Sequence, residues 1–288
     1  MNVAVLGSTG MLGGRIISVL RNAGLVVVST SKKGGFGIDD VAFDVRRARI
    51  EDALSDLRCH PDFIINAIGV IKPHIVDSRS ESVGNAIEVN SVFPYQLAEV
   101  AERSDVRVIQ IATDCVYSGL HGSYTEISSH DCSDVYGKSK SLGEVISRNV
   151  MHVRVSVIGP EKNRSTSLWE WVRNQPIGNR VNGYVNHLWN GVTTDAFGEI
   201  CRTIIQSDKF VAGTTHLVPA DKASKYELVK LIASHCNRDD LQVQPISLEN
   251  SVNRTLATNN AARNEELWQC STFERTPTIS EMIAKVSI

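Results

Sequence analysis

The sequence predicts an α/β fold, a Rossmann-type doubly wound parallel sheet with a smaller C-terminal lobe. Short apolar runs alternate with amphipathic segments through the first half of the chain, and a glycine-rich loop follows the first run. Apolar runs without polar alternation are typical of parallel strands that are buried on both faces. The expected strands are residues 3–6, 26–29, 63–66, 106–111 and 153–157.

Segments with helical periodicity separate these strands. Apolar residues recur at helical spacing between Met11 and Ala23, and residues 83–104 form a longer helix candidate. The pattern loosens after residue 158, and further helices are expected near residues 195–207 and 225–236. No linker-like tract or internal repeat separates the two halves, so we expect the C-terminal lobe to fold against the open end of the sheet.

The composition is that of an ordinary globular protein. Of the 288 residues, 42% are hydrophobic and 22% charged, and the net charge of -2 leaves no basic footprint for nucleic acid. The first apolar run is too short for a signal peptide, and no stretch approaches the roughly 20 apolar residues of a membrane span. Cysteines and histidines lack metal-ligand spacing. We expect a cytoplasmic protein with no metal, and with neither nucleic acid nor membrane as a partner.

The glycine-rich loop, Gly7-Ser8-Thr9-Gly10-Met11-Leu12-Gly13, lies between the first expected strand and helix. Glycines in such a loop give phosphates access to the backbone N–H groups of a helix N-terminus. Glycine loops also serve as plain turns, but the position at residue 7 favours dinucleotide binding. Residues 1–158 then form the dinucleotide-binding Rossmann domain, and residues 159–288 form a smaller substrate-binding lobe that is interleaved with it.

The end of the second strand indicates which dinucleotide binds. NAD sites usually carry an acidic residue about 20 residues after the loop, which binds the ribose 2′-hydroxyl. Here the strand ends Ser29-Thr30-Ser31-Lys32-Lys33, and no carboxylate precedes Asp39. Hydroxyls and cations suit a 2′-phosphate, so we expect NADPH (or NADP⁺) as the cofactor, with Ser31 and Lys32 as ligands. NADH is the open alternative, since a basic turn can also be simply solvated.

A tyrosine and a lysine lie four residues apart in a segment that is expected to open a helix, Tyr136-Gly137-Lys138-Ser139-Lys140. Residues at this spacing share one helix face. An ammonium about 4 Å from the phenol, at an effective dielectric near 20, is worth roughly 4 kcal/mol, or about three pKa units. We therefore expect Lys140 to lower the pKa of Tyr136. Two unrelated exposed residues would show the same spacing.

A threonine at a strand end strengthens the catalytic interpretation. Thr113 ends the strand Gln110-Ile111-Ala112-Thr113, where a parallel strand runs out into the ligand crevice. Its hydroxyl is expected to hold the carbonyl oxygen that Tyr136 protonates. The sequence therefore predicts Thr113, Tyr136 and Lys140 as one catalytic set.

Together these motifs resemble the extended short-chain dehydrogenase/reductases, and within them the dTDP-4-dehydrorhamnose reductase group. Further matches are Gly143-Glu144, Asn190-Gly191-Val192-Thr193-Thr194 and Ser224-Lys225-Tyr226-Glu227-Leu228, so the resemblance covers nearly the whole chain. It implies that Lys140 also holds the nicotinamide ribose. It further implies cofactor contacts at the loop residues Gly7, Thr9, Gly10, Met11, Leu12 and Gly13, at Asp44 and Val45, at Ala67, Ile68 and Gly69, and at Asn90, Tyr136 and Lys140.

Two departures from the related families bear on the reaction. Sugar-nucleotide dehydratases, which are relatives, carry glutamate where this chain has Cys115, and a thiol is a poor substitute for that acid. Dehydration is therefore not expected, and we expect no redox or nucleophilic role for Cys115. The rhamnose-forming enzymes usually show tryptophan where this chain has Val157, so the rhamnose substrate itself is open.

Substrate contacts are expected at the strand end and in the second half. The candidates are Thr113, Asp114, Cys115, Trp189, Asn190 and Arg254, with Lys162, Arg164, Tyr184 and His187 as further choices. Trp189 precedes a turn and could stack on a nucleotide base, whereas Trp169 and Trp171 are expected in the core. Arg254 resembles the family's late arginine and could bind a diphosphate.

The predicted function is NADP(H)-dependent reduction of a nucleotide-linked 4-keto-6-deoxy sugar, in nucleotide-sugar and polysaccharide biosynthesis. A nucleotide-diphosphate sugar is then the substrate, and a homodimer is compatible with the sequence. One alternative is a sugar-nucleotide epimerase with tightly bound NAD. Another is a non-catalytic regulatory subunit, because the β-subunit of methionine adenosyltransferase resembles the same reductases.

Overall fold

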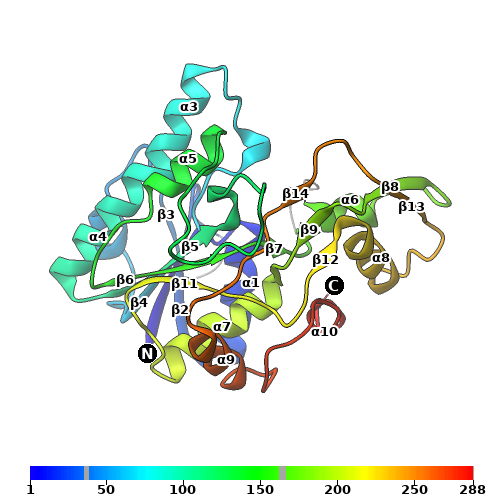
Figure 1. Cartoon of the computed structure of the whole chain (residues 1–288). Coiled ribbons are helices and arrows are strands. Elements are labelled where there is room, and N and C mark those ends of the chain that lie inside the picture. Colours follow the sequence, from blue (N-terminus) through cyan, green and yellow to red (C-terminus); the bar gives the residue numbers. More distant parts are fainter. Residues whose placement is uncertain (36–38, 162–166, 288) are drawn as a thin grey trace.

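A seven-stranded parallel sheet lies at the centre of the computed structural model, which describes residues 1–35, 39–161 and 167–287 (Figure 1). The strand order, β11-β6-β5-β4-β1-β2-β3, contains the 3-2-1-4-5-6 order of doubly wound dinucleotide-binding sheets. The predicted Rossmann-type α/β fold is confirmed. The strands are β1 (Asn2–Leu6), β2 (Val26–Ser31), β3 (Asp40–Ala42), β4 (Phe63–Asn66), β5 (Arg107–Thr113), β6 (Val150–Val155) and β11 (Gly213–His216).

Helices cover both faces of the sheet, because successive strand residues point to opposite sides. In β1, Val3 and Val5 pack in one core with α1 and α7, whereas Ala4 and Leu6 pack in a second core with α2 and α4. This explains why the strands read as continuous apolar runs. The helices of these two layers are α1 (Met11–Asn22), α7 (Thr194–Gln206), α2 (Ile50–Ser55) and α4 (Phe93–Ser104).

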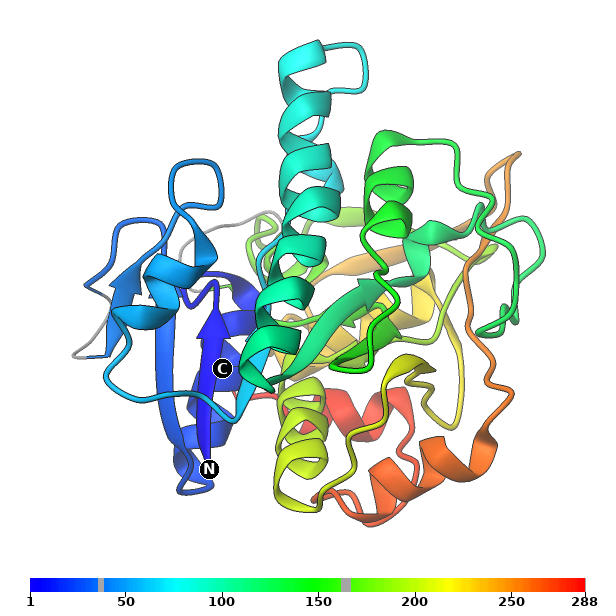
Figure 2. The ribbon, with the colours of Figure 1, turned by 90° about the vertical axis from the view of Figure 1, so that its left-hand side faces the viewer.

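A long helical segment runs along one side of the molecule and carries the helix expected at residues 83–104. It consists of α3 (Ser80–Ile87), the π-helical turn η2 (Glu88–Val92) and α4, which follow one another without a gap (Figure 2). The helix α5 (Val135–Leu142) packs against η2. At Gly143, just after α5, a Cβ atom would lie 1.9 Å from the carbonyl oxygen of Asn90. Glycine therefore permits the close approach of α5 to the long helix.

The second half of the chain contributes to the sheet as well as to the smaller lobe. Strand β11 pairs with β6, and α7 packs against α1. The expected domain boundary at residue 158 therefore does not mark the end of the sheet, because β11 follows it in the sequence. The remaining elements are η1 (Lys72–His74), η3 (Asp114–Val116), β7 (Val157–Ile158), α6 (Leu168–Arg173), β8 (Arg180–Tyr184), β9 (His187–Trp189), β10 (Val192–Thr193), β12 (Ala223–Ser224), α8 (Lys225–His235), β13 (Gln242–Ile246), β14 (Val252–Asn253), α9 (Ala261–Gln269) and α10 (Ile279–Ala284).

Two strands of the sheet, β3 and β11, were not expected from the sequence. Strand β3 is three residues long and half-exposed, and β11 reads Gly-Thr-Thr-His. Both lie at the sheet edges, where a strand needs no continuous apolar run. Among the described residues, no helix has the length and apolar character needed to cross a membrane.

The contact between α5 and the long helix can be tested with two glycines. Gly143→Ala should lower the free energy of unfolding by about 1–3 kcal/mol, because the added methyl group meets the backbone of Asn90. Gly84→Ala is the control, since it lies exposed in α3 with nothing within 4 Å of an added Cβ. It should raise stability by roughly 0.5–1 kcal/mol. Urea denaturation of both variants measures the difference, and equal effects would contradict the packing.

Candidate active site

The glycine loop joins β1 to α1 at the carboxyl edge of the sheet. Gly7 has φ +89°, a conformation that favours glycine, and a Cβ at Gly13 would lie 2.2 Å from the carbonyl oxygen of Gly7. Gly10 precedes α1, and no side chain caps the helix N-terminus there. The N–H groups at Met11 and Leu12 therefore belong to an uncapped first turn, which has the form of a phosphate cradle.

The end of β2 differs from the sequence-based interpretation. Ser31 is buried, and its hydroxyl donates to Asp40 at 2.6 Å, while the hydroxyls of Ser8 and Ser29 donate to the same carboxylate at 2.8 and 2.7 Å. Asp40 comes from β3, which pairs with β2. The sequence has no carboxylate between Ser29 and Asp39, but the pairing of β3 with β2 brings the Asp40 carboxylate beside the second strand. Lys32 is exposed, with its ammonium 3.9 Å from Asp44.

The remaining cofactor candidates lie along the same edge. Asp44 accepts a hydrogen bond from the N–H of Arg46, and Val45 packs against the α2–α4 core. Ala67 and Ile68 touch the turn at Gly7, where an added Cβ would lie 3.2 Å from both. Ala67 and Ile68 therefore adjoin the glycine loop, as a dinucleotide-binding edge requires.

Asn90 is buried in η2, and its amide is fully engaged. The Oδ1 atom accepts from the N–H of Val70 at 2.9 Å, and the Nδ2 atom donates to the carbonyl of Val70 at 2.9 Å and to the hydroxyl of Ser139 at 3.0 Å. Gly69 lies beside it. Asn90 thus ties the loop after β4 to α5, which is a bracing position and offers no donor to a ligand.

The structure brings the three expected catalytic residues to one edge of the sheet. Thr113 ends β5, and its hydroxyl is close enough to the phenol of Tyr136, the second residue of α5, to act on the pKa of that phenol. The Thr113 hydroxyl also accepts the N–H of Cys115 at 3.2 Å and donates to Asp114 at 3.3 Å. Lys140 lies one turn further along α5, and its ammonium donates to the carbonyl of Ile111 at 2.8 Å.

The protonation of this set differs from the expectation. Burial raises the pKa of Tyr136, the neighbouring Cys115 raises it further, and the hydrogen bond from Thr113 acts in the opposite direction. Lys140 is not among the groups that shift it most. The predicted lowering by Lys140 is therefore not found, because the ammonium is directed to the Ile111 carbonyl. Burial also lowers the pKa of Lys140 itself to about 8, and Glu144 opposes that shift.

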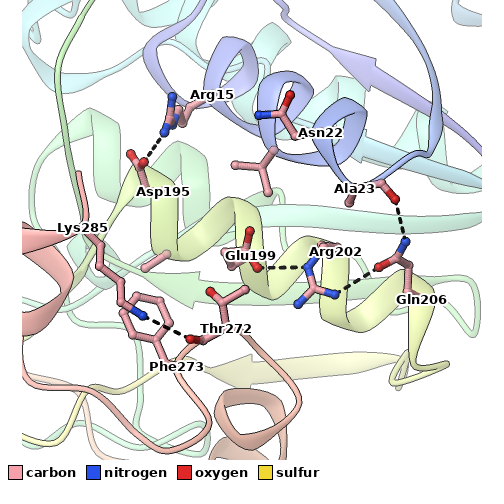
Figure 3. Close-up of a pocket in the computed structure, with 12 residues that line it drawn as sticks. Arg15, Asn22, Ala23, Asp195, Glu199, Arg202, Gln206, Thr272, Phe273 and Lys285 are labelled. Atoms are coloured by element: carbon pink, nitrogen blue, oxygen red, sulfur yellow. Dashed lines mark hydrogen bonds and ion pairs between the residues drawn. The ribbon is translucent and has the colours of Figure 1, made fainter. Parts of the chain in front are cut away.

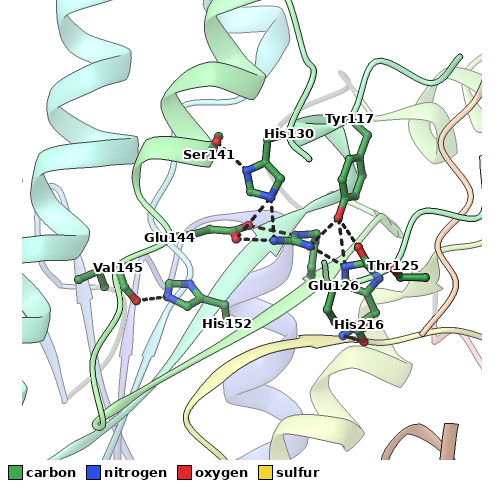
Figure 4. A network of polar contacts seen from close by, with 10 residues as sticks. Tyr117, Thr125, Glu126, His130, Ser141, Glu144, Val145, His152 and His216 are labelled. Atoms are coloured by element: carbon green, nitrogen blue, oxygen red, sulfur yellow. Dashed lines mark hydrogen bonds and ion pairs between the residues drawn. The ribbon is translucent and has the colours of Figure 1, made fainter. Parts of the chain in front are cut away.

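A buried polar network stands behind α5 (Figure 4). Arg154, on β6, is 2% exposed and forms an ion pair with Glu144, which follows α5. The same guanidinium donates to the hydroxyl of Tyr117 at 2.6 Å, to Nε2 of His216 at 2.7 Å and to Nε2 of His130 at 2.9 Å. The network therefore links α5 to β6, β11 and the loop after β5.

The network fixes the tautomer of its histidines. Arginine only donates hydrogen bonds, so Nε2 of both His130 and His216 must be an acceptor. Each ring then carries its proton on Nδ1, which donates to the hydroxyl of Ser141 and to the carbonyl of Ala257, both at 2.7 Å. Burial lowers the pKa of both histidines, and Arg154 lowers it further.

Two of the substrate-side candidates are adjacent residues at the end of β5. Burial raises the pKa of Asp114 despite the opposing charges of Arg254 and Lys225. Burial also raises the pKa of the Cys115 thiol to about 12, so the thiol stays protonated near neutral pH. This agrees with the absence of a nucleophilic role that the sequence predicts.

The other substrate candidates are distributed between the crevice and the core. Trp189 is 5% exposed in the α1–α7 core and donates to the hydroxyl of Ser156 at 2.9 Å, so its ring presents no open stacking face. Asn190 is buried and exchanges two hydrogen bonds with the backbone of Leu256. Arg254 donates from Nε to the carbonyl of Tyr117 at 2.9 Å.

The further choices named from the sequence lie elsewhere. Trp169 is fully buried as expected, but Trp171 is 41% exposed rather than in the core. Tyr184 and His187 pack against each other, with ring centroids 4.9 Å apart. Lys162 and Arg164 lie outside the described residues.

Sequence reasoning missed two charged residues, one near the expected cofactor site and one near the expected substrate site. Asp40 could have been found only by expecting a short edge strand beside β2. Lys225 opens α8 within a motif that was matched, and its ammonium lies 5.7 Å from the ring centroid of Trp189. A cation at the first position of this helix was the signal in the sequence that could have marked Lys225 as a candidate.

A separate cavity of about 540 Å³ lies between α1 and α7 (Figure 3). Thr113, Tyr136 and Lys140 do not line it. In the cavity wall Arg15 pairs with Asp195 and Arg202 with Glu199, and Lys285 donates to the carbonyl of Thr272. We do not assign the chemistry to this cavity, because the glycine loop and catalytic set lie elsewhere.

The buried histidines predict that stability falls on acidification. Burial lowers the pKa of His130, His152 and His216, so each stays neutral in the folded chain after the unfolded chain begins to protonate near pH 6.5. The free energy of unfolding should therefore fall as the pH drops below about 6.5 and level off below the folded-state pKa values, by up to about 1.4 kcal/mol per pH unit for each histidine.

Urea denaturation between pH 5 and pH 8 measures this dependence. His216→Gln keeps an acceptor for Arg154 and removes one titrating ring, so the slope should become shallower. His60→Gln is the control, since His60 is exposed and lies outside the network. A pH-independent stability of the starting protein would contradict the neutral network.

Comparisons with known proteins agree with this geometry. Residues 1–286 match the family model described as RmlD substrate binding domain. The chain is 29% identical over 147 residues to the spore coat polysaccharide biosynthesis protein SpsK of Bacillus subtilis, an alignment that covers 51% of this chain and 48% of that protein. The chain therefore aligns with only about half the length of that relative.

A second relative and a solved structure align over more of the chain. Methionine adenosyltransferase 2 subunit beta of Rattus norvegicus is 23% identical over 258 residues, which is 85% of this chain and 75% of that protein. The dTDP-4-dehydrorhamnose reductase of Bacillus anthracis, solved in complex with NADP, has a TM-score of 0.78 at 19% identity and covers 99% of this chain and 97% of that one. This structural likeness supports the fold. Because the family model spans nearly the whole chain, the chain belongs to the RmlD substrate binding domain family, the dTDP-4-dehydrorhamnose reductase-like group of the extended short-chain dehydrogenase/reductases.

Proposed function

We propose that this chain is an NADP(H)-dependent reductase of a nucleotide-linked 4-keto-6-deoxy sugar. The observation that carries the proposal is the proximity of the hydroxyls of Thr113 and Tyr136 at the carboxyl edge of the parallel sheet, the edge that also carries the glycine loop. Ligands of open α/β sheets bind outside this edge. The sheet with its loop holds the cofactor in this proposal, and the segments from β8 to β14 contribute to the substrate side.

The residues present fit a dinucleotide. The uncapped N-terminus of α1 offers N–H groups to a pyrophosphate, and the glycines at positions 7 and 13 leave room where a Cβ would collide with backbone. Lys140 is positioned on α5 to reach a nicotinamide ribose from the Ile111 carbonyl that it now contacts. When bound, the reduced cofactor supplies a hydride for the ketone carbon of the sugar.

The chain itself supplies the proton and holds the oxygen. The raised pKa of Tyr136 keeps its phenol protonated at neutral pH, so the residue is a proton donor in its resting state. Thr113 donates to the same carbonyl oxygen and thereby polarises it. Lys140, with a pKa of about 8, is close enough to neutrality to return a proton to Tyr136 through a hydrogen-bonded ribose hydroxyl or water.

The sugar class rests on the family and on the named relatives. SpsK is a spore coat polysaccharide biosynthesis protein, and the Bacillus anthracis structure is a dTDP-4-dehydrorhamnose reductase. We therefore place this chain in nucleotide-sugar biosynthesis for polysaccharide assembly. The test is a screen of NADPH oxidation against 4-keto-6-deoxy sugars on dTDP, UDP, GDP and CDP. No oxidation with any of them would contradict the proposal.

The regulatory alternative has one specific observation behind it, the alignment with the methionine adenosyltransferase subunit over 85% of this chain. A non-catalytic subunit has no need of a proton donor, whereas Thr113, Tyr136 and Lys140 are assembled here. Two results together would favour the alternative: co-purification with a methionine adenosyltransferase catalytic chain, and no turnover in the sugar screen.

The catalytic set predicts three distinguishable variants. Tyr136→Phe should lower turnover by about 10²–10⁴ while folding and cofactor binding survive, because only the acid is lost. Thr113→Val should lower kcat with little change in cofactor affinity, and Lys140→Met should also weaken NADPH binding. Tyr95→Phe, at an exposed position on α4, is the control and should leave turnover unchanged. Near-normal turnover of Tyr136→Phe would rule out the mechanism.

The choice between NADPH and NADH is predicted from two lysines and one carboxylate near the end of β2. We expect kcat/KM to be higher with NADPH than with NADH, since Lys32 and Lys33 can face a 2′-phosphate. Replacing both with methionine should reduce the NADPH to NADH ratio. Asp40→Asn should increase it, because a carboxylate at the end of β2 repels a 2′-phosphate. A preference for NADH in the starting protein, or no response to either change, would contradict this assignment.

A further inference from the structure

A cluster of opposite charges lies where β5 ends and α8 begins. Lys225 is the first residue of α8, and β12 before it pairs with β9 so that Ala223 stands opposite Trp189. Arg254 reaches the same place from the segment after β14, held by its Nε–H bond to the carbonyl of Tyr117. Both cations act on the buried carboxylate of Asp114. Three distant parts of the sequence therefore meet beside Thr113.

The cations of this cluster are not satisfied by the protein. Within the described residues, the Lys225 ammonium has no hydrogen-bond acceptor and no carboxylate within 4.0 Å. It lies over the ring of Trp189. The two terminal nitrogens of Arg254 likewise have no acceptor there. Against these two cations stands the single carboxylate of Asp114. The cluster thus carries one positive charge more than it can pair.

Such an arrangement leaves the two cations free to bind a ligand. Lys225 is half-buried, and this partial burial lowers the pKa of its ammonium, for which the described residues supply no acceptor. By contrast, Arg154 lies deeper and has an acceptor for its ion pair and for three hydrogen bonds. Lys225 differs from Arg154, because it is half-buried and its charge is left to water or to a ligand.

We propose that Lys225 is a substrate-binding residue, which together with Arg254 binds an anionic oxygen group of the nucleotide-sugar substrate. The inference rests on the proposed function for the substrate class. Arginine binds such groups through its planar fork and lysine as a point charge, so the two complement each other on one anion. Two groups of a nucleotide sugar have this chemistry: the diphosphate, and a carboxylate on the sugar. Trp189, buried beneath Lys225, then supports the lysine rather than stacking on a base.

The test is a binding titration that does not depend on turnover. The chain with NADPH is titrated calorimetrically with UDP, dTDP, UDP-glucose and UDP-glucuronic acid, in the starting protein and in Lys225→Met, Lys225→Arg and Lys222→Met. Methionine keeps the apolar cover over Trp189 and removes the charge. Lys222→Met is the matched control, since Lys222 is exposed three residues before Lys225.

Lys225→Met should weaken binding by about 10- to 100-fold, the loss of a charge-assisted hydrogen bond, and Lys225→Arg should retain most of the affinity. Weaker binding of all four ligands identifies the diphosphate as the anion, and weaker binding of UDP-glucuronic acid alone identifies the sugar carboxylate. Unchanged affinities in Lys225→Met, or no binding of any ligand to the starting protein, would overturn the proposal.

Thermal unfolding of the ligand-free variants separates binding from a structural role. A lysine that only supports the fold would lower the Tm when replaced, whereas a ligand-binding lysine without a protein acceptor should leave the Tm unchanged or raise it. A lower Tm with unchanged affinities would also overturn the proposal. Failure of the proposed reductase would appear elsewhere, as nucleotide binding that still depends on Lys225 but no NADPH oxidation in the sugar screen.

Discussion

The ion pair between Arg154 and Glu144 is the interaction on which the geometry of the active site depends. Arg154 is the fifth of the six residues of β6 and almost without exposure, and Glu144 lies two residues after the helix that carries Tyr136 and Lys140. A buried pair of this kind loses hydration on both charges, so it is tolerated only where further hydrogen bonds satisfy the remaining donors. Those bonds come from Tyr117, His130 and His216.

The consequence is a fixed position for α5. Helix α5 is eight residues long, too short to be stable by itself, so its place is set by what it packs against. The ion pair holds its C-terminal end to the sheet, Asn90 holds Ser139 to the loop after β4, and Gly143 allows direct contact with η2. These restraints place the phenol of Tyr136 against the hydroxyl of Thr113. The catalytic contact is therefore a result of packing behind the site.

Charge is treated differently on the two sides of α5. Behind the helix, all three guanidinium nitrogens of Arg154 have hydrogen-bond acceptors, and burial keeps the neighbouring imidazoles neutral. On the crevice side, Lys225 and Arg254 exceed the charge of Asp114, and the Lys225 ammonium and the terminal nitrogens of Arg254 have no acceptor among the described residues. A satisfied network gives rigidity, and an unsatisfied one gives affinity for a ligand. The fold thus combines a rigid support behind α5 with cations on the crevice side that are free to bind a ligand.

The sequence by itself determined the inner strands of the sheet, the glycine loop and the candidate catalytic residues. Continuous apolar runs, glycine spacing and the Tyr136–Lys140 interval are local patterns, and the physics that they report is local as well. The edge strands escaped because they bury little, and with β3 the carboxylate of Asp40 escaped too. Protonation and pairing were decided only by the tertiary structure. Whether Lys140 faces Tyr136 or the Ile111 carbonyl, whether Trp189 is open, and whether Lys225 meets Asp114 depend on contacts between segments far apart in the chain, which spacing cannot encode.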